Sequence, residues 1–335
     1  MAKKLQQLKA LIHCNFSIIL SKCFKQHPTL MIMKFIQKNY LVLFALIFSI
    51  VLGAKLFSTE PDSRSHAVLV SVAPHKFFVE KIAGSTVKIG LMVPAGASAH
   101  TYEPTPKQML DATKADIWFY VGEGFEPKVR AALKSYNPQM YFADLRQNLD
   151  LISFHEGHKK CCAHHEGHYD LHYWLSPIQA KIQAQTIEQA LSRIYPENAA
   201  LYADNLAKFH QELDQLDGEI RQMMNKPHNP YIMISHPAYA YFCRDYGCQQ
   251  LSIEIEGKDP TPKQLTQIIQ AARQHHIKTI FVQIQYSSKG AKLIAAQIGA
   301  QVINLDPYSE NYYESLRTIA QAFSSQPPIP SPTKD

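Results

Sequence analysis

The sequence predicts an α/β protein in which two lobes, each built on a four-stranded parallel sheet, are joined by a long helix. Short β-branched or aromatic runs alternate with helical patterns in the first and last parts of the chain. The middle contains no strand pattern and one long amphipathic stripe. A length of 335 residues is sufficient for two compact units.

Eight short apolar runs predict the strands, four in each lobe. In the first lobe they are Val68–Val72, Val87–Val93, Ile117–Val121 and Met140–Ala143. In the second lobe they are Tyr231–Ser235, Gln250–Ile255, Thr279–Ile284 and Gln301–Leu305. Because helical patterns separate these runs, we expect the strands to run parallel, with helices on both faces of each sheet.

Helices are predicted between the runs, over Thr105–Lys114, Glu126–Ser135, Thr261–His275 and Ser288–Gly299. In the middle, Ser176-Pro177 is typical of an N-cap followed by Pro at the first helical position. A second helix starts at Pro196, and its apolar stripe is Leu201, Leu206, Phe209, Leu213, Leu216 and Ile220. If this helix is continuous over residues 197–225, it is about 43 Å long and can bridge two lobes.

The basic excess of the chain lies in its first 54 residues. They contain seven lysines and no acid, so the net charge of +6 becomes −1 (27 basic against 28 acidic residues) from Lys55 onward. This near-neutral body gives no indication of nucleic-acid binding. Lys34 and Lys38 precede an apolar run of about 15 residues, which is typical of a secretory signal and shorter than a membrane span of ~20 residues. We therefore expect export to the periplasm, with an uncleaved membrane anchor as the alternative.

These patterns divide the chain into five parts. They are a leader (1–54), an N-terminal lobe (66–175), a helical segment (176–226), a C-terminal lobe (230–323) and a Pro-rich tail (324–335). Residues 155–168 of the N-terminal lobe form a His-rich loop.

The His-rich loop is a candidate auxiliary metal site. It contains two cysteines, Cys161 and Cys162, and five histidines: His155, His158, His164, His165 and His168. Imidazole and thiolate are suited to zinc and other late first-row metals. The spacing lacks zinc-finger regularity, so we expect weak capture of metal by exchanging ligands. A solvated polar loop with biased composition is the alternative.

Three further histidines lie at the ends of predicted elements. His100 follows the run Val87–Val93, His236 ends a strand of the second lobe, and His172 lies just ahead of the helix start at Ser176. Open α/β sheets bind ligands at the carboxyl ends of their strands. Three neutral imidazoles would suit zinc and leave a fourth position for a carboxylate or water. A structural role is the alternative for each histidine taken alone.

Four phrases carry a resemblance to a known family. They are Pro94-Ala-Gly-Ala-Ser-Ala-His-Thr-Tyr-Glu-Pro-Thr-Pro, Asp170-Leu-His-Tyr-Trp-Leu-Ser-Pro, Ser235-His-Pro-Ala-Tyr-Ala-Tyr-Phe and Leu305-Asp-Pro-Tyr-Ser-Glu-Asn-Tyr-Tyr. In this order they resemble the metal-specific solute-binding proteins of ABC importers, in particular the zinc-binding periplasmic component. The resemblance spans about residues 68–323.

The resemblance implies that Zn²⁺ is held in a cleft between two lobes, which a rigid long helix joins. It implies His100, His172 and His236 as ligands and delivery of the ion to an ABC permease in the membrane. We expect the protein to be a monomer. The resemblance also makes Asp306 a candidate for the fourth ligand. The alternative is a water ligand, with Asp306-Pro307 acting as a helix N-cap followed by Pro.

Two positions depart from the family pattern. Ala99 stands where some zinc-binding members carry a Glu, and Gln283 stands where many relatives carry a Glu that faces the cleft. A glutamine carries no charge, so Gln283 should weaken the negative field of the site. Three histidines with at most one Asp still resemble a zinc set more than a manganese set.

Two other function classes remain open from sequence. The first is a binding protein of the same fold whose cargo is manganese or iron, or an adhesin. The second is a zinc hydrolase using Glu103 or Glu256 as base, which the absence of a His-Glu-x-x-His pair disfavours. No phosphate-binding Gly-x-x-x-x-Gly-Lys-Ser/Thr loop occurs, so another chain must hydrolyse ATP. We therefore expect that this chain is not an enzyme.

Cys243 and Cys248 are close enough in sequence to pair after export.

Overall fold

The computed structural model describes residues 66–153, 169–254, 260–286 and 289–329, which all belong to one compact unit, Ser65–Asp335. The leader predicted over residues 1–54 lies outside the described residues. The same is true of the His-rich loop at 155–168, of Glu256 and of the last six residues of the tail.

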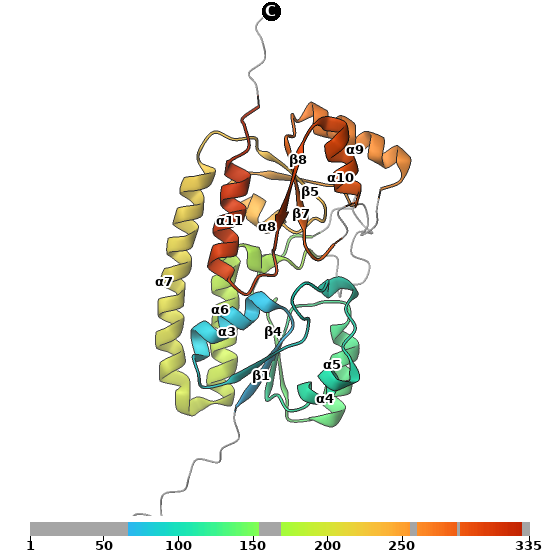
Figure 1. Ribbon diagram of the computed structural model, residues 1–335. Helices are drawn as coiled ribbons and strands as arrows, with labels where there is room; N and C mark the ends of the chain where they lie inside the picture. The colour runs from blue at the N-terminus through green and yellow to red at the C-terminus, as the bar shows by residue number, and fades with distance from the viewer. Residues whose placement is uncertain (1–65, 154–168, 255–259, 287–288, 330–335) are drawn as a thin grey trace, which may run out of the picture. The chain divides into compact units, whose positions relative to one another are not determined.

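The N-terminal lobe is a parallel sheet with strand order β2-β1-β3-β4 (Figure 1). Its strands are β1 (Ala67–Val70), β2 (Lys88–Leu91), β3 (Ile117–Tyr120) and β4 (Tyr141–Asp144), and its helices are α3 (Ala73–Ala83), α4 (Pro106–Ala112) and α5 (Glu126–Tyr136). Val68 of β1 pairs with Ile89 and Ile117 on its two sides. The two central strands are almost wholly apolar because both of their faces are covered.

The C-terminal lobe repeats this arrangement with strand order β6-β5-β7-β8. Its strands are β5 (Tyr231–Ile234), β6 (Gln249–Ser252), β7 (Thr279–Gln283) and β8 (Gln301–Leu305), and its helices are α8 (Ala240–Tyr246), α9 (Pro262–Gln274), α10 (Lys289–Ile298) and α11 (Tyr312–Ser324). In each sheet the strand order changes direction at the first strand in sequence, β1 or β5. The second strand lies on one side of it, and the third lies on the other side. Such a reversal leaves a crevice at the carboxyl ends of the strands.

The predicted fold class, with two four-stranded parallel sheets, is confirmed. Each strand begins within one residue of the predicted run, but most end earlier. β1, for example, ends at Val70, although the apolar run continues to Val72, which is fully buried. The difference arises because apolar residues report burial, and the first residues of the loops that follow the strands are buried as well.

Two consecutive helices connect the lobes. α6 (Pro177–Ile194) begins as predicted, with the Ser176 side chain accepting a hydrogen bond from the backbone N–H of Gln179. A short 3₁₀ turn, η4 (Pro196–Asn198), precedes α7 (Ala199–Met224). The 26 residues of α7 make it about 39 Å long at 1.5 Å per residue. In Figure 1, α7 runs alongside α6 and α11, and its contacts include α3 of the first lobe.

The apolar stripe of α7 is largely as predicted. Phe209, Leu213, Leu216 and Ile220 are buried. Leu201 is exposed, and Tyr202 takes its place in the core. Each residue of a helix is rotated by about 100° from the one before it. Tyr202 and Phe209 are seven positions apart, so they lie on the same face of α7, whereas Leu201 does not.

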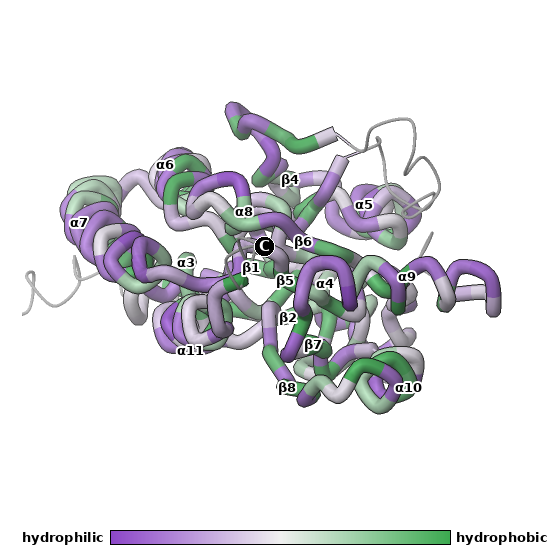
Figure 2. The backbone as a smooth tube through the Cα atoms, turned by 90° about the horizontal axis from the view of Figure 1, so that it is seen from above, coloured by the Kyte–Doolittle hydropathy of each residue, from purple (hydrophilic) through white to green (hydrophobic). Residues whose placement is uncertain are grey.

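One hydrophobic core spans both lobes. It includes β1 and β3 residues, the buried faces of α6 and α7, and α11 residues such as Leu316 and Phe323. Figure 2 shows alternating hydrophilic and hydrophobic stretches along helices such as α7 and α10, as expected for amphipathic helices. Ion pairs add to this connection: Lys76 Nζ of α3 lies 2.8 Å from Glu310, and Arg317 Nε of α11 lies 2.7 Å from Glu219 of α7.

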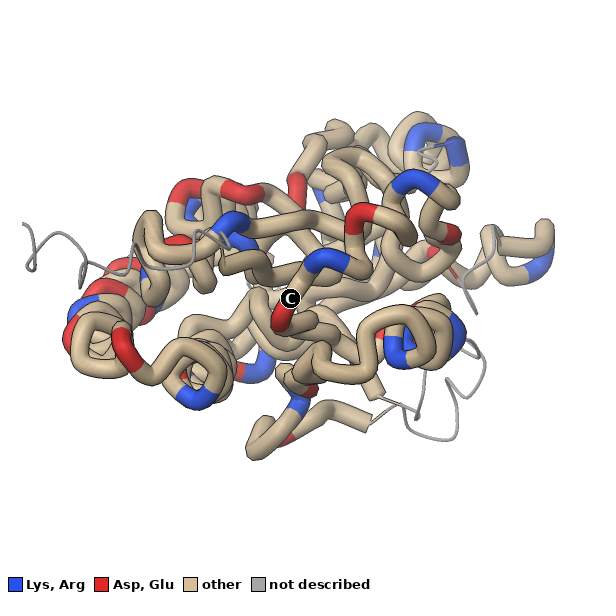
Figure 3. The backbone as a smooth tube through the Cα atoms, turned by 90° about the horizontal axis from the view of Figure 1, so that it is seen from below, with Lys and Arg blue, Asp and Glu red and all other residues tan. Residues whose placement is uncertain are grey.

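Acidic and basic residues are interspersed over the described part of the chain (Figure 3). This distribution agrees with the near-neutral charge of the body after the leader. Among the described helices, none has the length and apolar character needed to cross a membrane.

Candidate metal centre

Three histidines from distant segments meet between the lobes. His100 lies in a 3₁₀ turn, η1 (Ala99–Thr101), after β2. His172 immediately precedes the 3₁₀ turn η3 (Tyr173–Leu175), and His236 lies two residues beyond the end of β5. One nitrogen of each lies within 4.8 Å of the other two, and the described residues contain no other such group of His, Cys, Asp or Glu side chains.

The segment that carries His172 is fixed to both lobes. Tyr173 donates a hydrogen bond from its hydroxyl to the carbonyl of Val121, in the N-terminal lobe. Trp174 donates from its indole N–H to the carbonyl of Pro307, in the C-terminal lobe, at 2.8 Å. Both rings are fully buried. His172 is therefore held by its neighbours in a defined position relative to the two sheets.

Each of the three histidines has a carboxylate on its Nδ1 atom. The distances are 3.0 Å for His100–Glu123, 2.8 Å for His172–Asp170 and 2.8 Å for His236–Glu254. A carboxylate can only accept, so each Nδ1 carries a proton and each Nε2 of a neutral ring presents a lone pair. This is the arrangement by which carboxylates orient metal-binding histidines and increase their basicity.

The Nε2 atoms face one another at a distance that suits a metal. Those of His100 and His236 are 3.1 Å apart. Zn–N bonds of about 2.0–2.1 Å at tetrahedral angles place two ligand nitrogens about 3.3 Å apart. Two lone pairs this close repel one another unless a proton or a cation lies between them. The geometry therefore favours a positive charge in the middle of the group.

The electrostatics of His100 agree with this geometry. Burial is the largest single influence and lowers its pKa, but the charge and hydrogen bond of Glu123, with the charges of Asp170 and Glu254, outweigh it. The net effect raises the pKa of His100 above the ordinary histidine value. The side chains of His172 and His236 are each only 3% exposed. A cation bound here would be screened from water and surrounded by compensating negative charge.

Asp306 is not part of this group. Its Oδ1 atom accepts hydrogen bonds from Gln285 Nε2 at 2.6 Å and from the backbone N–H of Tyr308 at 3.0 Å. Asp306 thus closes a short turn, and the N-cap of the next helix, α11, is Asn311. The structure brings together the three predicted histidines and leaves the fourth predicted residue, Asp306, on hydrogen bonds of its own.

Several residues around the histidines were not predicted from the sequence. They are the three carboxylates, Glu123, Asp170 and Glu254, and two tyrosines, Tyr286 and Tyr308. Tyr286 stacks on His236 with ring centroids 4.2 Å apart, and the hydroxyl of Tyr308 lies 3.3 Å from Nε2 of His172. A usable signal was present for two carboxylates, because Glu123 and Glu254 follow β3 and β6 at the carboxyl ends, as the histidines do.

One departure from the family pattern, Gln283, has a local explanation. Gln283 is buried in β7 and donates a hydrogen bond to the backbone carbonyl of His236 at 3.2 Å. It therefore supports the ligand loop in place of supplying charge. Negative charge comes from Glu254, in the loop after β6, which contacts His236 directly.

The base of the His-rich loop is described, although the loop itself is not. Ser153 and Tyr169 form an isolated antiparallel bridge, and the backbone N–H of Asp170 donates to the carbonyl of Ile152 at 2.9 Å. The two ends of the loop therefore meet just before Asp170 and His172.

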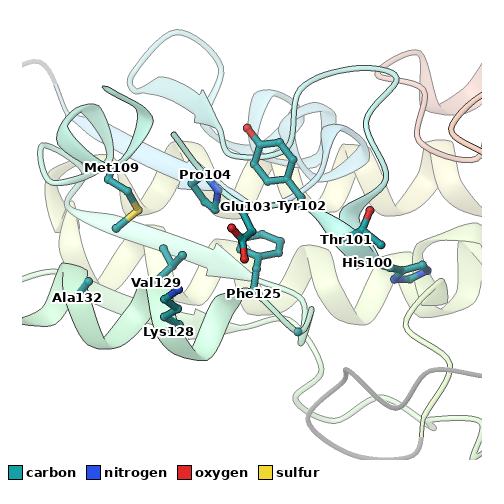
Figure 4. A pocket seen from close by; sticks show the side chains of 11 residues that line it. His100, Thr101, Tyr102, Glu103, Pro104, Met109, Phe125, Lys128, Val129 and Ala132 are labelled. Atoms are coloured by element: carbon teal, nitrogen blue, oxygen red, sulfur yellow. The ribbon is translucent and has the colours of Figure 1, made fainter. Parts of the chain in front are cut away.

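A pocket of about 470 Å³ opens beside His100 (Figure 4). His100 lies at one end, and the wall is formed largely by apolar side chains such as Met109, Phe125 and Val129. Of the three histidines only His100 lines it, so it is not the place where they meet. Glu103, one of the two bases considered for a hydrolase, is exposed and lines this pocket.

Cys243 lies in helix α8, and Cys248 lies in the turn between α8 and β6. Their Sγ atoms are 2.7 Å apart, both side chains are buried, and both are free thiols in the structure. Burial raises the pKa of the Cys243 thiol well above its usual value, so it is neutral. Pairing of the two after export stays a prediction.

Comparisons with known proteins agree with the fold. The model of a family described as "Zinc-uptake complex component A periplasmic", ZnuA, matches residues 68–326. A provisionally named metal-binding protein of Chlamydia muridarum is 33% identical over 258 residues, which are 77% of this chain and 90% of that protein. The high-affinity zinc uptake system protein ZnuA of Bacillus subtilis is 27% identical over 241 residues, 70% of this chain and 76% of that protein.

A solved structure has the same fold. The crystal structure of ZnuA matches with a TM-score of 0.73 and 34% identity, covering 78% of this chain and 99% of its own.

Proposed function

The chain belongs to the family of periplasmic zinc-uptake components, and from this membership we propose that it captures one Zn²⁺ ion outside the cytoplasmic membrane and passes it to an ABC permease. Members of this family are solute-binding proteins of transport systems. The proposed ligands are His100, His172 and His236. Zinc is the cargo and leaves the protein again at the permease.

The observation that carries this proposal is the pairing of every proposed ligand with its own carboxylate. Three neutral imidazoles offer three lone pairs, and hydrogen bonds to Glu123, Asp170 and Glu254 fix the orientation of the three rings. Imidazole nitrogen is a preferred ligand for zinc, whereas manganese prefers carboxylate and other oxygen ligands. The ligand set thus favours zinc over manganese.

Two further parts of the proposal concern residues outside those described. The leader over residues 1–54 would direct the chain to the periplasm. The histidines at 155, 158, 164, 165 and 168 would collect zinc weakly near the main site, and the bridge between Ser153 and Tyr169 would keep the loop's base close to His172. We further propose that the protein acts as a monomer.

A competition titration tests the assignment of cargo and the division of labour between the two sets of histidines. The full chain and a variant lacking residues 155–168 are stripped of metal and titrated with Zn²⁺ in the presence of a chelator, and then with Mn²⁺ as competitor. We expect one tight zinc site in both proteins, fewer weak sites in the deletion variant, and no displacement of zinc by equimolar manganese. Loss of tight binding on deletion would place the main site in the loop, and displacement by manganese would make zinc the wrong cargo.

A further inference from the structure

The hydroxyl group of Tyr308 contacts the atom that the proposed site offers to the metal. It lies 3.3 Å from Nε2 of His172, and Tyr308 is only 6% exposed. Because Nδ1 of His172 carries its proton toward Asp170, Nε2 can only accept. The Tyr308 hydroxyl is therefore the donor in this contact.

A second tyrosine lies beside the first. Burial raises the pKa of the Tyr308 hydroxyl well above its usual value, and the neighbouring Tyr286 raises it further. Tyr286 accepts a hydrogen bond from Ser98 Oγ at 3.4 Å, while its ring stacks on His236. Two tyrosines that follow strands of the C-terminal lobe therefore lie against the proposed ligands, Tyr286 on the ring of His236 and Tyr308 on Nε2 of His172.

Asp306 positions Tyr308 and does not reach the histidines. Its Oδ1 atom accepts from the backbone N–H of Tyr308 and from Gln285. These two hydrogen bonds fix the carboxylate outside the group of three histidines. As a ligand, Asp306 would add a fourth carboxylate to a site where Glu123, Asp170 and Glu254 already contact the three histidines. With three carboxylates beside one divalent ion, a neutral fourth ligand is electrostatically preferable.

Zinc binding would remove the acceptor of Tyr308. The ion takes the lone pair of His172 Nε2, and a buried hydroxyl left without an acceptor is destabilising. Three imidazoles leave the fourth corner of a tetrahedron open. A water molecule bound there would give the Tyr308 hydroxyl a new acceptor.

We propose that Tyr308 is a positioning residue whose hydroxyl group hydrogen-bonds a water molecule that completes the zinc shell in place of Asp306. This inference rests on the proposed zinc site and specifies its fourth position. A site of three histidines and one oriented water is four-coordinate, which suits zinc and disfavours metals that need octahedral oxygen shells.

Three substitutions in the full chain test the inference, with zinc affinity measured by chelator competition. Tyr308→Phe keeps the ring and removes the hydroxyl, and it should weaken zinc binding by about 10-fold. Asp306→Asn keeps the Oδ1 acceptor and removes the charge, and it should change the affinity less than about 2-fold. Tyr312→Phe is the matched control, because the Tyr312 hydroxyl is also buried and bonded, to the carbonyl of Trp174, but contacts none of the three histidines.

The visible spectrum of the Co²⁺-loaded protein reports the fourth ligand directly. We expect a four-coordinate spectrum that added azide perturbs, since azide can replace water, and a changed spectrum in Tyr308→Phe alone. Wild-type affinity in Tyr308→Phe combined with loss in Asp306→Asn would overturn the inference while leaving the three-histidine site intact. A phenolate charge-transfer band would also overturn it. Absence of tight zinc binding in the wild-type chain would overturn the proposed function as well.

Discussion

At the scale of single residues, the proposed site depends on how carboxylates and histidines are matched. Glu123, Asp170 and Glu254 determine which nitrogen of each ring is free. They also hold the pKa of His100 above the ordinary histidine range, so a proton competes with the metal for this ring. The same contact therefore prepares the lone pair and sets the pH at which the metal is lost.

The pH dependence of zinc affinity follows from this competition. Zinc needs the neutral form of His100, and the raised pKa of His100 means that protonation begins at a higher pH than for a free histidine, near 6.5. We expect affinity to be constant at high pH and to fall, as the pH drops, from above 6.5 downward. Chelator competition at a series of pH values measures this.

The variant Glu123→Gln provides the control for that measurement. It removes the charge that raises the pKa of His100, so the fall in affinity should move to lower pH while the affinity at high pH weakens about 10- to 100-fold. Glu103→Gln, at an exposed residue of the neighbouring pocket, should change neither quantity. An unchanged midpoint in Glu123→Gln would show that His100 is not the titrating ligand.

His75 is a histidine with a structural role, and it makes stability depend on pH. It is fully buried in α3, its Nε2 atom contacts Gln183 Oε1 at 2.7 Å, and burial lowers its pKa from 6.5 to about 4. The pKa of His75 is higher in the unfolded chain than in the folded protein. Neutral His75 therefore stabilises the fold above about pH 6.5, and this contribution is lost as the pH falls toward 4. The free energy of unfolding should fall by about 3 kcal/mol over this range.

Urea unfolding of the metal-free protein between pH 7 and pH 4 measures this contribution. His75→Gln cannot titrate, so its stability should be lower at pH 7 and should fall less steeply on acidification. His276→Gln, at an exposed histidine, should keep the wild-type slope. A wild-type slope in His75→Gln would assign the acid sensitivity to other groups.

At the scale of elements, sequence patterns predicted the strands and the connecting helix well because each is dominated by one local property. The eight strands and α7 follow from the period and length of apolar runs. The ligand histidines were accessible for a related reason, since two of them follow strands at the carboxyl ends. By contrast, nothing in the spacing of Tyr286 or Tyr308 shows that they meet the histidines, because tertiary packing decides which loops face one another.

The α7 stripe gives a prediction with a matched control on the same helix. Leu213 is fully buried, whereas Leu201 was predicted to be in the stripe but is 44% exposed. Leu213→Ala should lower the free energy of unfolding by about 2–5 kcal/mol. Leu201→Ala should change it by less than about 0.5 kcal/mol. Equal effects in urea unfolding would mean that α7 buries a different face.

At the scale of the whole described unit, the two lobes share one core. The cluster that includes Val70 of the first sheet and Phe281 of the second is continuous through α6, α7 and α11. Rotating one lobe away from the other would expose part of this core, at about 25 cal/mol for each Å² of apolar surface. We therefore expect the histidines to be held near their ligand positions before metal arrives, which limits the ordering cost of binding.

The most direct test of the central claim is the zinc affinity and metal content of single variants of the three histidines. His100→Ala, His172→Ala and His236→Ala are made in a chain that lacks residues 155–168, so that the His-rich loop cannot supply metal. His276→Ala is the control. We predict one zinc ion per chain in the parent and the control, and a loss of affinity in each ligand variant at least as large as the roughly 10- to 100-fold effect of removing a supporting carboxylate. Full zinc content and unchanged affinity in all three ligand variants would contradict the account.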